Sequence, residues 1–189
     1  MPPTKVEAPR AQASPLMSVA YVLQTLAELK TPDDIVVEEA PSARPVMQAY
    51  LPITRSETFY TMDSGGLGYG MPAAVGIALG KPDSRVICLM GDGSSMYSIQ
   101  GLWSAAQHAL QIAFVIVKNG TYEALNEFGR HFQMSQLPGV QLPQLDFCGL
   151  ARSQGVQAVS VTSIEKLDDA LLGAFRADAP MLVEVAVEQ

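Results

Sequence analysis

The sequence contains little cysteine and few basic residues. Cys88 and Cys148 are its only cysteines among 189 residues, and they lie sixty positions apart in apolar contexts. Neither a disulfide framework nor a zinc-binding spacing follows from such a pair. Lysine and arginine number 12 against 19 acidic residues, which gives a net charge of −7. This balance argues against nucleic acid as the main partner, because phosphate binding needs clustered basic side chains.

Long hydrophobic runs are also missing. The longest apolar stretches, at 86–90 and 112–117, are far too short to cross a bilayer, and residues 1–15 contain no apolar run typical of a signal peptide. We therefore expect no membrane partner and a cytoplasmic location. Hydrophobic residues nevertheless make up 48% of the chain and charged residues 16%. That composition supports a packed core and excludes global disorder.

The pattern along the chain indicates one domain after a short tail. Residues 1–15 hold four prolines and predict a linker or tail, while residues 16–189 form the domain. Apolar periodicity and turn signals predict strands at 35–37, 58–61, 85–90, 112–117, 156–160 and 181–187, and helices at 16–30, 45–50, 72–79, 97–110, 121–128, 146–154 and 163–177. This alternation predicts an α/β fold with a doubly wound, mostly parallel sheet of about six strands and helices on both faces.

Ligands of such sheets bind in the loops at the carboxyl ends of strands, which here directs attention to residues 64–70, 91–95 and 119–122. The first loop contains GYGMPA, a formal match to the dinucleotide fingerprint. That fingerprint should follow a strand directly, whereas residues 62–64 and two extra glycines precede it here. We therefore disfavour a nicotinamide site. A Walker lysine motif is absent from the sequence.

Asp92 and Asn119 form the more informative pair. Asp92 follows the strand at 86–90, and Asn119 leaves the next strand 27 positions later, the length of one strand–helix–strand return. If the two strands are neighbours, a carboxylate and an amide oxygen meet in one crevice and suit Mg²⁺, which would complete its octahedron with phosphate oxygens and water. The glycines beside Asp92 would let a bulky anion approach the backbone. The alternative is that Asp92 is only a turn former or helix cap.

Four segments carry a family resemblance that covers about residues 16–187: SGGLGYGMPAAVGIAL, VICLMGDGSSMYSIQGLWSAAQ, FVIVKNGTYEAL and LPQLDFCGLARSQGVQA. They resemble the carboxyl-terminal, diphosphate-binding domain of benzoylformate decarboxylase-like enzymes, a family of thiamine diphosphate-dependent 2-oxo acid decarboxylases. The resemblance implies two cofactors, thiamine diphosphate and Mg²⁺. It implies that the metal is bound by the side chains of Asp92 and Asn119 and by the backbone carbonyl of Thr121.

The same resemblance implies the remaining cofactor contacts. Gly91, Gly93, Ser94 and Tyr122 would surround the diphosphate. Ser42 would reach it from the loop after the first strand, and Pro41 would offer only backbone atoms or shape. Gly65 and Leu67 would meet the aminopyrimidine ring. Leu67 would hold the cofactor bent, so that its own imino nitrogen can remove the thiazolium proton and the ring can accept the electrons released with CO₂.

Departures from the family pattern concern Lys118 and the substrate pocket. Lys118 replaces an asparagine, and we expect either a solvated neighbour or added positive charge near the phosphates. Thr61 replaces an aromatic pocket residue, so the pocket should favour branched or medium-length aliphatic 2-oxo acids. Ala124 and Phe128 share a helix face that the resemblance places on the pocket wall. The alternative is that both merely pack this helix onto the domain.

The family's catalytic glutamate and histidines belong to regions that nothing in this sequence matches, so we assign no catalytic residue here. We expect a pyrimidine-binding domain or subunit as partner, a homo-oligomer, and a chain that is an excised domain or one subunit of a carboxy-lyase, inactive alone. Two alternatives remain open: an acetolactate synthase-like carboligase domain, and a non-catalytic binding or regulatory domain that retains the fold.

Overall fold

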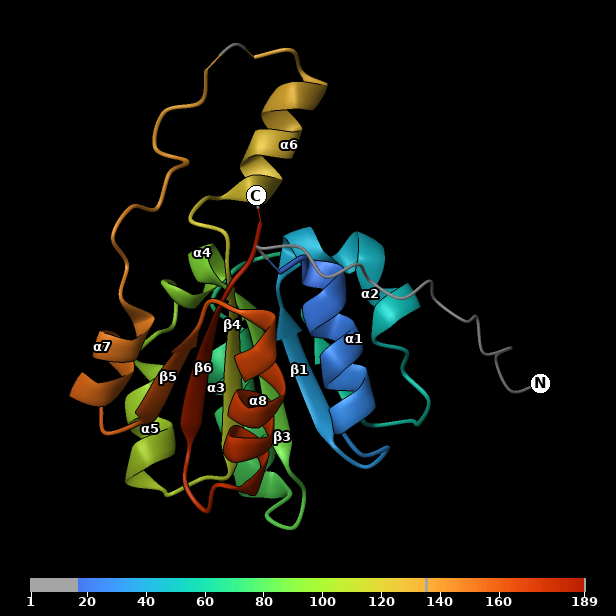
Figure 1. Ribbon diagram of the computed structural model, residues 1–189, viewed down its shortest axis with the longest axis vertical. Coiled ribbons are helices and arrows are strands. Elements are labelled where there is room, and N and C mark those ends of the chain that lie inside the picture. Colours follow the sequence, from blue (N-terminus) through green and yellow to red (C-terminus); the bar gives the residue numbers. More distant parts are fainter. Residues whose placement is uncertain (1–16, 135, 189) are drawn as a thin grey trace.

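The described strands form a single six-stranded sheet in the order β2-β1-β3-β4-β6-β5, with every neighbouring pair parallel (Figure 1). The computed structural model describes residues 17–134 and 136–188. The linker or tail predicted at 1–15 therefore lies outside the described residues. The predicted doubly wound sheet is confirmed, and all of its described strands are parallel.

The strands are β1 (Ile35–Glu39), β2 (Phe59–Thr61), β3 (Val86–Gly91), β4 (Ile112–Lys118), β5 (Gln157–Val161) and β6 (Met181–Ala186). The α-helices are α1 (Val19–Leu29), α2 (Arg44–Tyr50), α3 (Gly70–Gly80), α4 (Asp92–Ser95), α5 (Gly101–Gln107), α6 (Glu123–His131), α7 (Phe147–Ser153) and α8 (Leu167–Arg176). Short 3₁₀ turns, η1 (Pro41–Ala43) and η2 (Ile164–Lys166), precede α2 and α8.

Helices cover both faces of the sheet, because successive strand residues point to opposite sides. In β1, Val36 joins a core shared with α1, α2 and α8. Its neighbours Ile35 and Val37 join a second core, shared with α3, α5 and α7. Near-continuous apolar runs such as those of β3 and β4 are required where both faces of a strand are buried. The prediction of helices on both faces is confirmed (Figure 1).

Several helix boundaries differ from the sequence predictions; for example, α8 begins at Leu167 after the 3₁₀ turn η2, rather than at 163. The first helix begins at Val19, because the Ser18 hydroxyl caps it by accepting a hydrogen bond from the backbone N–H of Tyr21 at 3.2 Å. The helix predicted at 97–110 is shorter than expected. Residues 96–100 form i→i+3 turns after α4, and α5 begins only at Gly101.

The strand order creates a switch point that positions the site. β1 pairs with β2 on one side and with β3 on the other, so the chain leaves the ends of β1 and β3 in opposite directions. Ligands of open α/β sheets bind at such points. From the carboxyl end of β4, α6 rises above the body of the domain (Figure 1). Across the described residues, no helix is both long and apolar enough to span a bilayer.

Candidate functional site

A cavity of about 380 Å³ lies at the carboxyl ends of β1, β3 and β4. Its lining includes every residue for which the sequence predicts a cofactor or metal contact. These are Pro41, Ser42, Gly65, Leu67, Gly91, Asp92, Gly93, Ser94, Asn119, Thr121 and Tyr122. They come from four separate loops, which only the parallel register of the sheet brings to one edge. What these residues bind stays a prediction.

Asp92 lines this cavity and is only 3% exposed. One carboxylate oxygen accepts a hydrogen bond from the backbone N–H of Gly93 at 2.8 Å, and the other from that of Gly120 at 2.7 Å. Burial raises the pKa of Asp92 above its ordinary value, although these N–H groups favour the charged form. A divalent cation beside this carboxylate would offset the cost of burying its charge.

The loop after β4 is held in place by the segment at 140–142. Gly120 adopts a φ of +75°, which a glycine tolerates without strain. Its carbonyl accepts a hydrogen bond from Leu142, while the backbone N–H of Tyr122 donates to Val140, both at 2.8 Å. The Asn119 side-chain oxygen accepts from the Thr121 backbone N–H at 3.1 Å. This loop therefore presents amide and carbonyl oxygens from a fixed backbone.

The ring of Tyr122 lies directly against Gly93. A Cβ added to Gly93 would fall 2.5 Å from two carbon atoms of that ring, so no other residue fits there without moving the ring. Burial, aided by the neighbouring Tyr97 and the negative charge of Asp92, raises the pKa of Tyr122. The phenol therefore keeps its proton at neutral pH and can donate a hydrogen bond to an anion.

The charge of the cavity is negative. Asp92 and Glu123 line it, and no lysine or arginine is found among its described lining residues. A diphosphate would be repelled here unless a divalent cation accompanied it. The described residues contain no group of three or more His, Cys, Asp and Glu side chains placed to hold a metal. The available ligands are one carboxylate, one amide and backbone carbonyls, which suit Mg²⁺ that keeps water and phosphate oxygens in its shell.

The Lys118 side chain is bound to groups outside the cavity. Its ammonium donates to Glu184 at 3.1 Å and to the carbonyl of Leu145 at 2.5 Å. The side chain is 26% exposed and is not among the residues that line the cavity. The expectation of a merely solvated neighbour is wrong, because the ammonium is paired with Glu184. The alternative, positive charge near the phosphates, stays a prediction. Glu184 attracts the ammonium because this carboxylate lies buried on the neighbouring strand β6.

The three predicted pocket residues are only partly brought together. Ala124 lines the cavity, whereas Thr61 and Phe128 do not. The Thr61 hydroxyl instead donates to Glu38 at 2.7 Å. Phe128 is 59% exposed and contacts the ring of Phe132, with centroids 4.5 Å apart. Its ring is therefore not packed against the described part of the domain, contrary to the alternative proposed for it.

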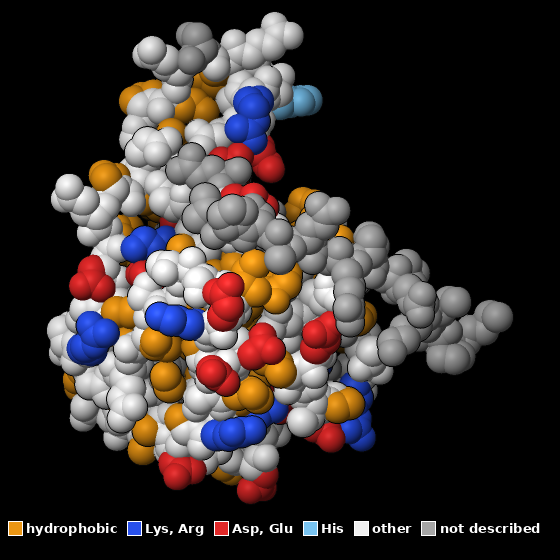
Figure 2. Space-filling model, in the orientation of Figure 1, with side chains coloured by type: hydrophobic (Ala, Val, Ile, Leu, Met, Phe, Trp, Pro, Cys, Tyr) orange, Lys and Arg blue, Asp and Glu red, His pale blue; other side chains and the backbone are white. Residues whose placement is uncertain are grey.

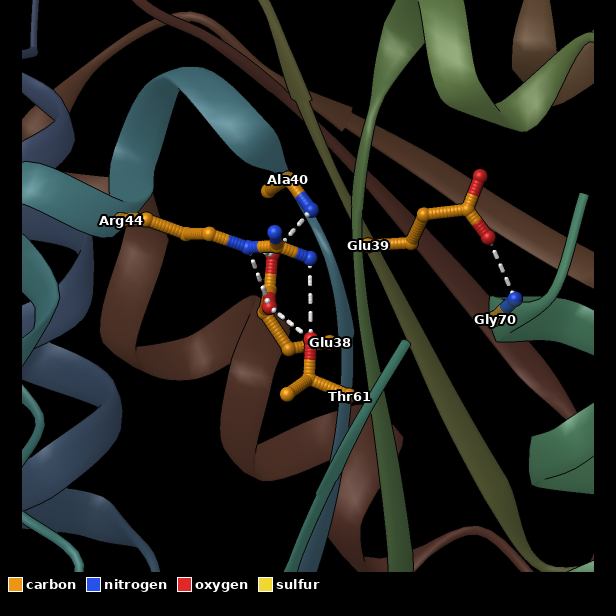
Figure 3. Close-up of polar contacts among 6 residues, drawn as sticks. All are labelled: Glu38, Glu39, Ala40, Arg44, Thr61 and Gly70. Atoms are coloured by element: carbon orange, nitrogen blue, oxygen red, sulfur yellow. Dashed lines mark hydrogen bonds and ion pairs between the residues drawn. The ribbon is translucent and has the colours of Figure 1, made fainter. Parts of the chain in front are cut away.

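Two buried glutamates at the end of β1 were missed by the sequence reasoning. We expected the strand to end at Val37, but it continues through Glu38 and Glu39, which are 1% and 0% exposed. Their position directly after a β-branched run, at the carboxyl end of a buried strand, was the available signal. Glu38 accepts hydrogen bonds from Ala40, Arg44 and Thr61 (Figure 3).

Comparisons with known proteins show the family to which the chain belongs. Residues 42–185 match the family described as "Thiamine pyrophosphate enzyme, C-terminal TPP binding domain". The chain is 40% identical, over 167 residues, to benzoylformate decarboxylase of Pseudomonas aeruginosa, covering 88% of this chain and 32% of that protein. It is 26% identical, over 170 residues, to the acetolactate synthase isozyme 2 large subunit of Escherichia coli, covering 89% of this chain and 31% of that subunit.

A solved structure of a related enzyme has a domain with the same fold. The thiamine diphosphate-dependent 4-hydroxybenzoylformate decarboxylase of Rhodococcus jostii RHA1 superposes with a TM-score of 0.94 at 35% identity. The match covers 100% of this chain and 36% of that protein. The chain thus spans about a third of the length of these relatives.

Proposed function

Because the chain belongs to the thiamine pyrophosphate enzymes, as their C-terminal TPP binding domain, we propose that its cavity binds the diphosphate end of thiamine diphosphate through Mg²⁺. The observation that carries this proposal is the convergence of eleven residues from four loops on one cavity at the switch point of the sheet. The negative charge of that cavity supports a requirement for the metal.

The donor set fits both groups. The Asp92 carboxylate, the Asn119 amide oxygen and the Thr121 carbonyl would hold Mg²⁺, whose remaining ligands are phosphate oxygens and water. Backbone N–H groups beside Gly93 and the hydroxyl of Ser94 would surround the diphosphate. The Tyr122 phenol, protonated at neutral pH, would donate a hydrogen bond to it as well. Gly93, which has no side chain, leaves room for the Tyr122 ring, two carbon atoms of which would lie 2.5 Å from an added Cβ.

When bound, thiamine diphosphate supplies a thiazolium carbon nucleophile and an electron sink for the electrons left by CO₂. The chain's own residues orient it. Leu67, which is 36% exposed, lines the cavity from the loop at 65–70. With Gly65 it would support the pyrimidine end and hold the bent conformation.

We propose that the whole enzyme decarboxylates 2-oxo acids and that a pyrimidine-binding domain or subunit completes its active site. Large hydrophobic side chains stand exposed on and near α6, where an apolar cluster is visible at the top of Figure 2. Those of Leu125, Phe128, Phe132 and Met134 are all more than half exposed. Exposed apolar surface of this kind supports association with a partner or with further copies.

The proposal is tested by calorimetric titration of the full-length enzyme, including its pyrimidine-binding domain or subunit, with thiamine diphosphate, with and without Mg²⁺. We expect binding only with the metal, and no binding by Asp92→Ala. Asp83→Ala is the matched control, because Asp83 is an exposed acid before the amino end of β3, at the opposite edge of the sheet. Equal affinity without Mg²⁺, or loss of binding in the control alone, would overturn the assignment.

A second candidate is an acetolactate synthase-like carboligase, favoured by the similarity to the Escherichia coli subunit. The same metal site would serve both reactions, because they differ in the second substrate rather than in cofactor binding. Product analysis of the full-length enzyme with pyruvate separates them. Release of acetaldehyde supports the decarboxylase, and accumulation of acetolactate supports the carboligase.

A further inference from the structure

β1 ends in two adjacent buried carboxylates that serve opposite faces of the sheet (Figure 3). Glu38 points toward α2 and is paired with Arg44 at 3.0 Å. Glu39 points to the other face and has no ion pair with any described residue. A carboxylate that is 0% exposed requires polar partners of another kind.

Those partners are two backbone N–H groups of the glycine-rich loop at 65–70. Gly68 donates to one carboxylate oxygen of Glu39 at 2.8 Å, and Gly70 donates to the other at 2.5 Å. Gly70 is the first residue of α3, and this helix has no side-chain cap of its own and no acidic residue in its first turn. Glu39 therefore caps α3 from a strand 31 positions earlier in the sequence.

The packing around Gly70 shows how closely the loop is seated. A Cβ on Gly70 would clash with the Met90 sulfur and lie 3.0 Å from the Glu39 Cβ. Glu39 and Met90 are register partners on β1 and β3, and Met90 is followed by Gly91 of the cavity. The positive φ of Gly68, +100°, lets the chain turn both N–H groups toward one carboxylate. Three cavity loops thus meet at Glu39.

We propose that Glu39 is a positioning residue that fixes the loop at 65–70, and with it Leu67, relative to the diphosphate and metal loops. The carboxylate reaches no cavity surface itself, since it is fully buried and absent from the lining. It acts through the backbone of Gly68 and Gly70. The consequence for cofactor orientation rests on the proposed function, whereas the effect on the loop does not.

Hydrogen–deuterium exchange of the chain without cofactor tests the effect on the loop. Glu39→Gln keeps the side-chain shape but replaces one acceptor oxygen by an NH₂ group, which cannot accept from the loop. We expect at least tenfold faster exchange at amides 65–70. Glu38→Gln is the matched control: it removes a neighbouring buried carboxylate and should accelerate exchange near α2 and β2 instead. Unchanged exchange at 65–70, or equal acceleration there in both variants, would overturn the proposal.

If Glu39→Gln fails to fold, amide exchange in the wild-type chain still tests the proposal. The amide protons of Gly68 and Gly70 should exchange as slowly as those in β3, when resolved by NMR. Exchange at the rate of an open loop would show that Glu39 does not hold them.

Binding measurements then test the consequence for orientation. In the presence of Mg²⁺, Glu39→Gln should weaken thiamine diphosphate binding about tenfold but inorganic pyrophosphate binding less than twofold, because the loop at 65–70 meets only the pyrimidine end. Equal weakening of both ligands would indicate general destabilisation and overturn the positioning role. If neither ligand binds the full-length wild-type enzyme, the proposed function fails, whereas the exchange result stands independently.

Discussion

The Asp92 carboxylate accepts a hydrogen bond from the backbone N–H of Gly120 at 2.7 Å, although 28 positions separate the two residues. This bond ties the loop after β3 to the loop after β4. The positive φ of Gly120 turns its N–H toward the carboxylate. The two loops that would share a metal are therefore already linked through the backbone.

The pKa of Asp92 predicts a specific pH dependence of stability. Burial raises this pKa above the ordinary 3.8. Below pH 3.8 the carboxyl is protonated in both the folded and the unfolded chain. Between the ordinary and the raised pKa, the folded chain keeps a proton that the unfolded chain has released. The contribution of Asp92 to the free energy of unfolding therefore falls as pH rises through that interval.

Urea denaturation of the wild type and Asp92→Asn at several pH values measures this contribution as a difference. We expect the free energy of unfolding of the wild type, relative to that of Asp92→Asn, to fall as the pH rises from 3.8. Mg²⁺ should reduce this fall because it favours the charged carboxylate. Asp83→Asn should show no corresponding trend. A wild-type minus Asp92→Asn difference that does not vary with pH would contradict the interpretation.

Gly93→Ala should disrupt the cavity through Tyr122. The added methyl group would lie 2.5 Å from the tyrosine ring, so the ring must move. We expect a loss of about 1–3 kcal/mol in the free energy of unfolding, typical of overpacking, together with loss of Mg²⁺-dependent thiamine diphosphate binding. Gly173→Ala in α8 is the control, because its Cβ would meet open space. That variant should gain about 0.5–1 kcal/mol from helix propensity, and both are measured by chemical denaturation.

Lys118→Met should destabilise the packing between the neighbouring strands β4 and β6. Among the described residues, Glu184, which is 7% exposed, would keep only Ser160 and the Phe147 N–H as partners. We expect a loss of about 1–3 kcal/mol, since an uncompensated buried charge is costly. The double variant Lys118→Met/Glu184→Gln should recover part of this loss. Lys81→Met, which breaks an exposed pair with Glu57, should not measurably change stability. Equal losses in both single variants would exclude a special role for Lys118.

Ala124→Ile should shift substrate preference toward smaller 2-oxo acids. Ala124 lines the cavity at the start of α6, and added side-chain volume there would exclude bulky groups. We expect the ratio of kcat/KM for benzoylformate to that for pyruvate to fall about tenfold in the full-length enzyme. Phe128→Ala tests whether the exposed ring joins the pocket after assembly. An unchanged ratio in both variants would remove these residues from the pocket wall.

The sequence by itself determined the layers of the fold and most of the candidate site. Apolar β-branched runs alternating with amphipathic segments are sufficient to predict buried parallel strands between helices. The glycines around Asp92 and the Asn-Gly pair at 119–120 can be recognised from the sequence, because each directly follows the end of its own strand. Their convergence followed from one general rule, that parallel strands place their carboxyl ends at one edge.

Only the tertiary structure decided which distant groups pair. The partner of Lys118 lies 66 positions away, and that of the Gly70 N–H lies 31 positions earlier. No periodicity encodes either pairing, because each depends on the strand order β1-β3-β4-β6 and on side-chain directions at the strand ends. The buried Glu39 shows the physical reason most clearly. From sequence alone, a charged residue at a strand end is expected to face solvent. In the folded chain, Glu39 is buried because the uncapped N-terminus of α3 packs against it.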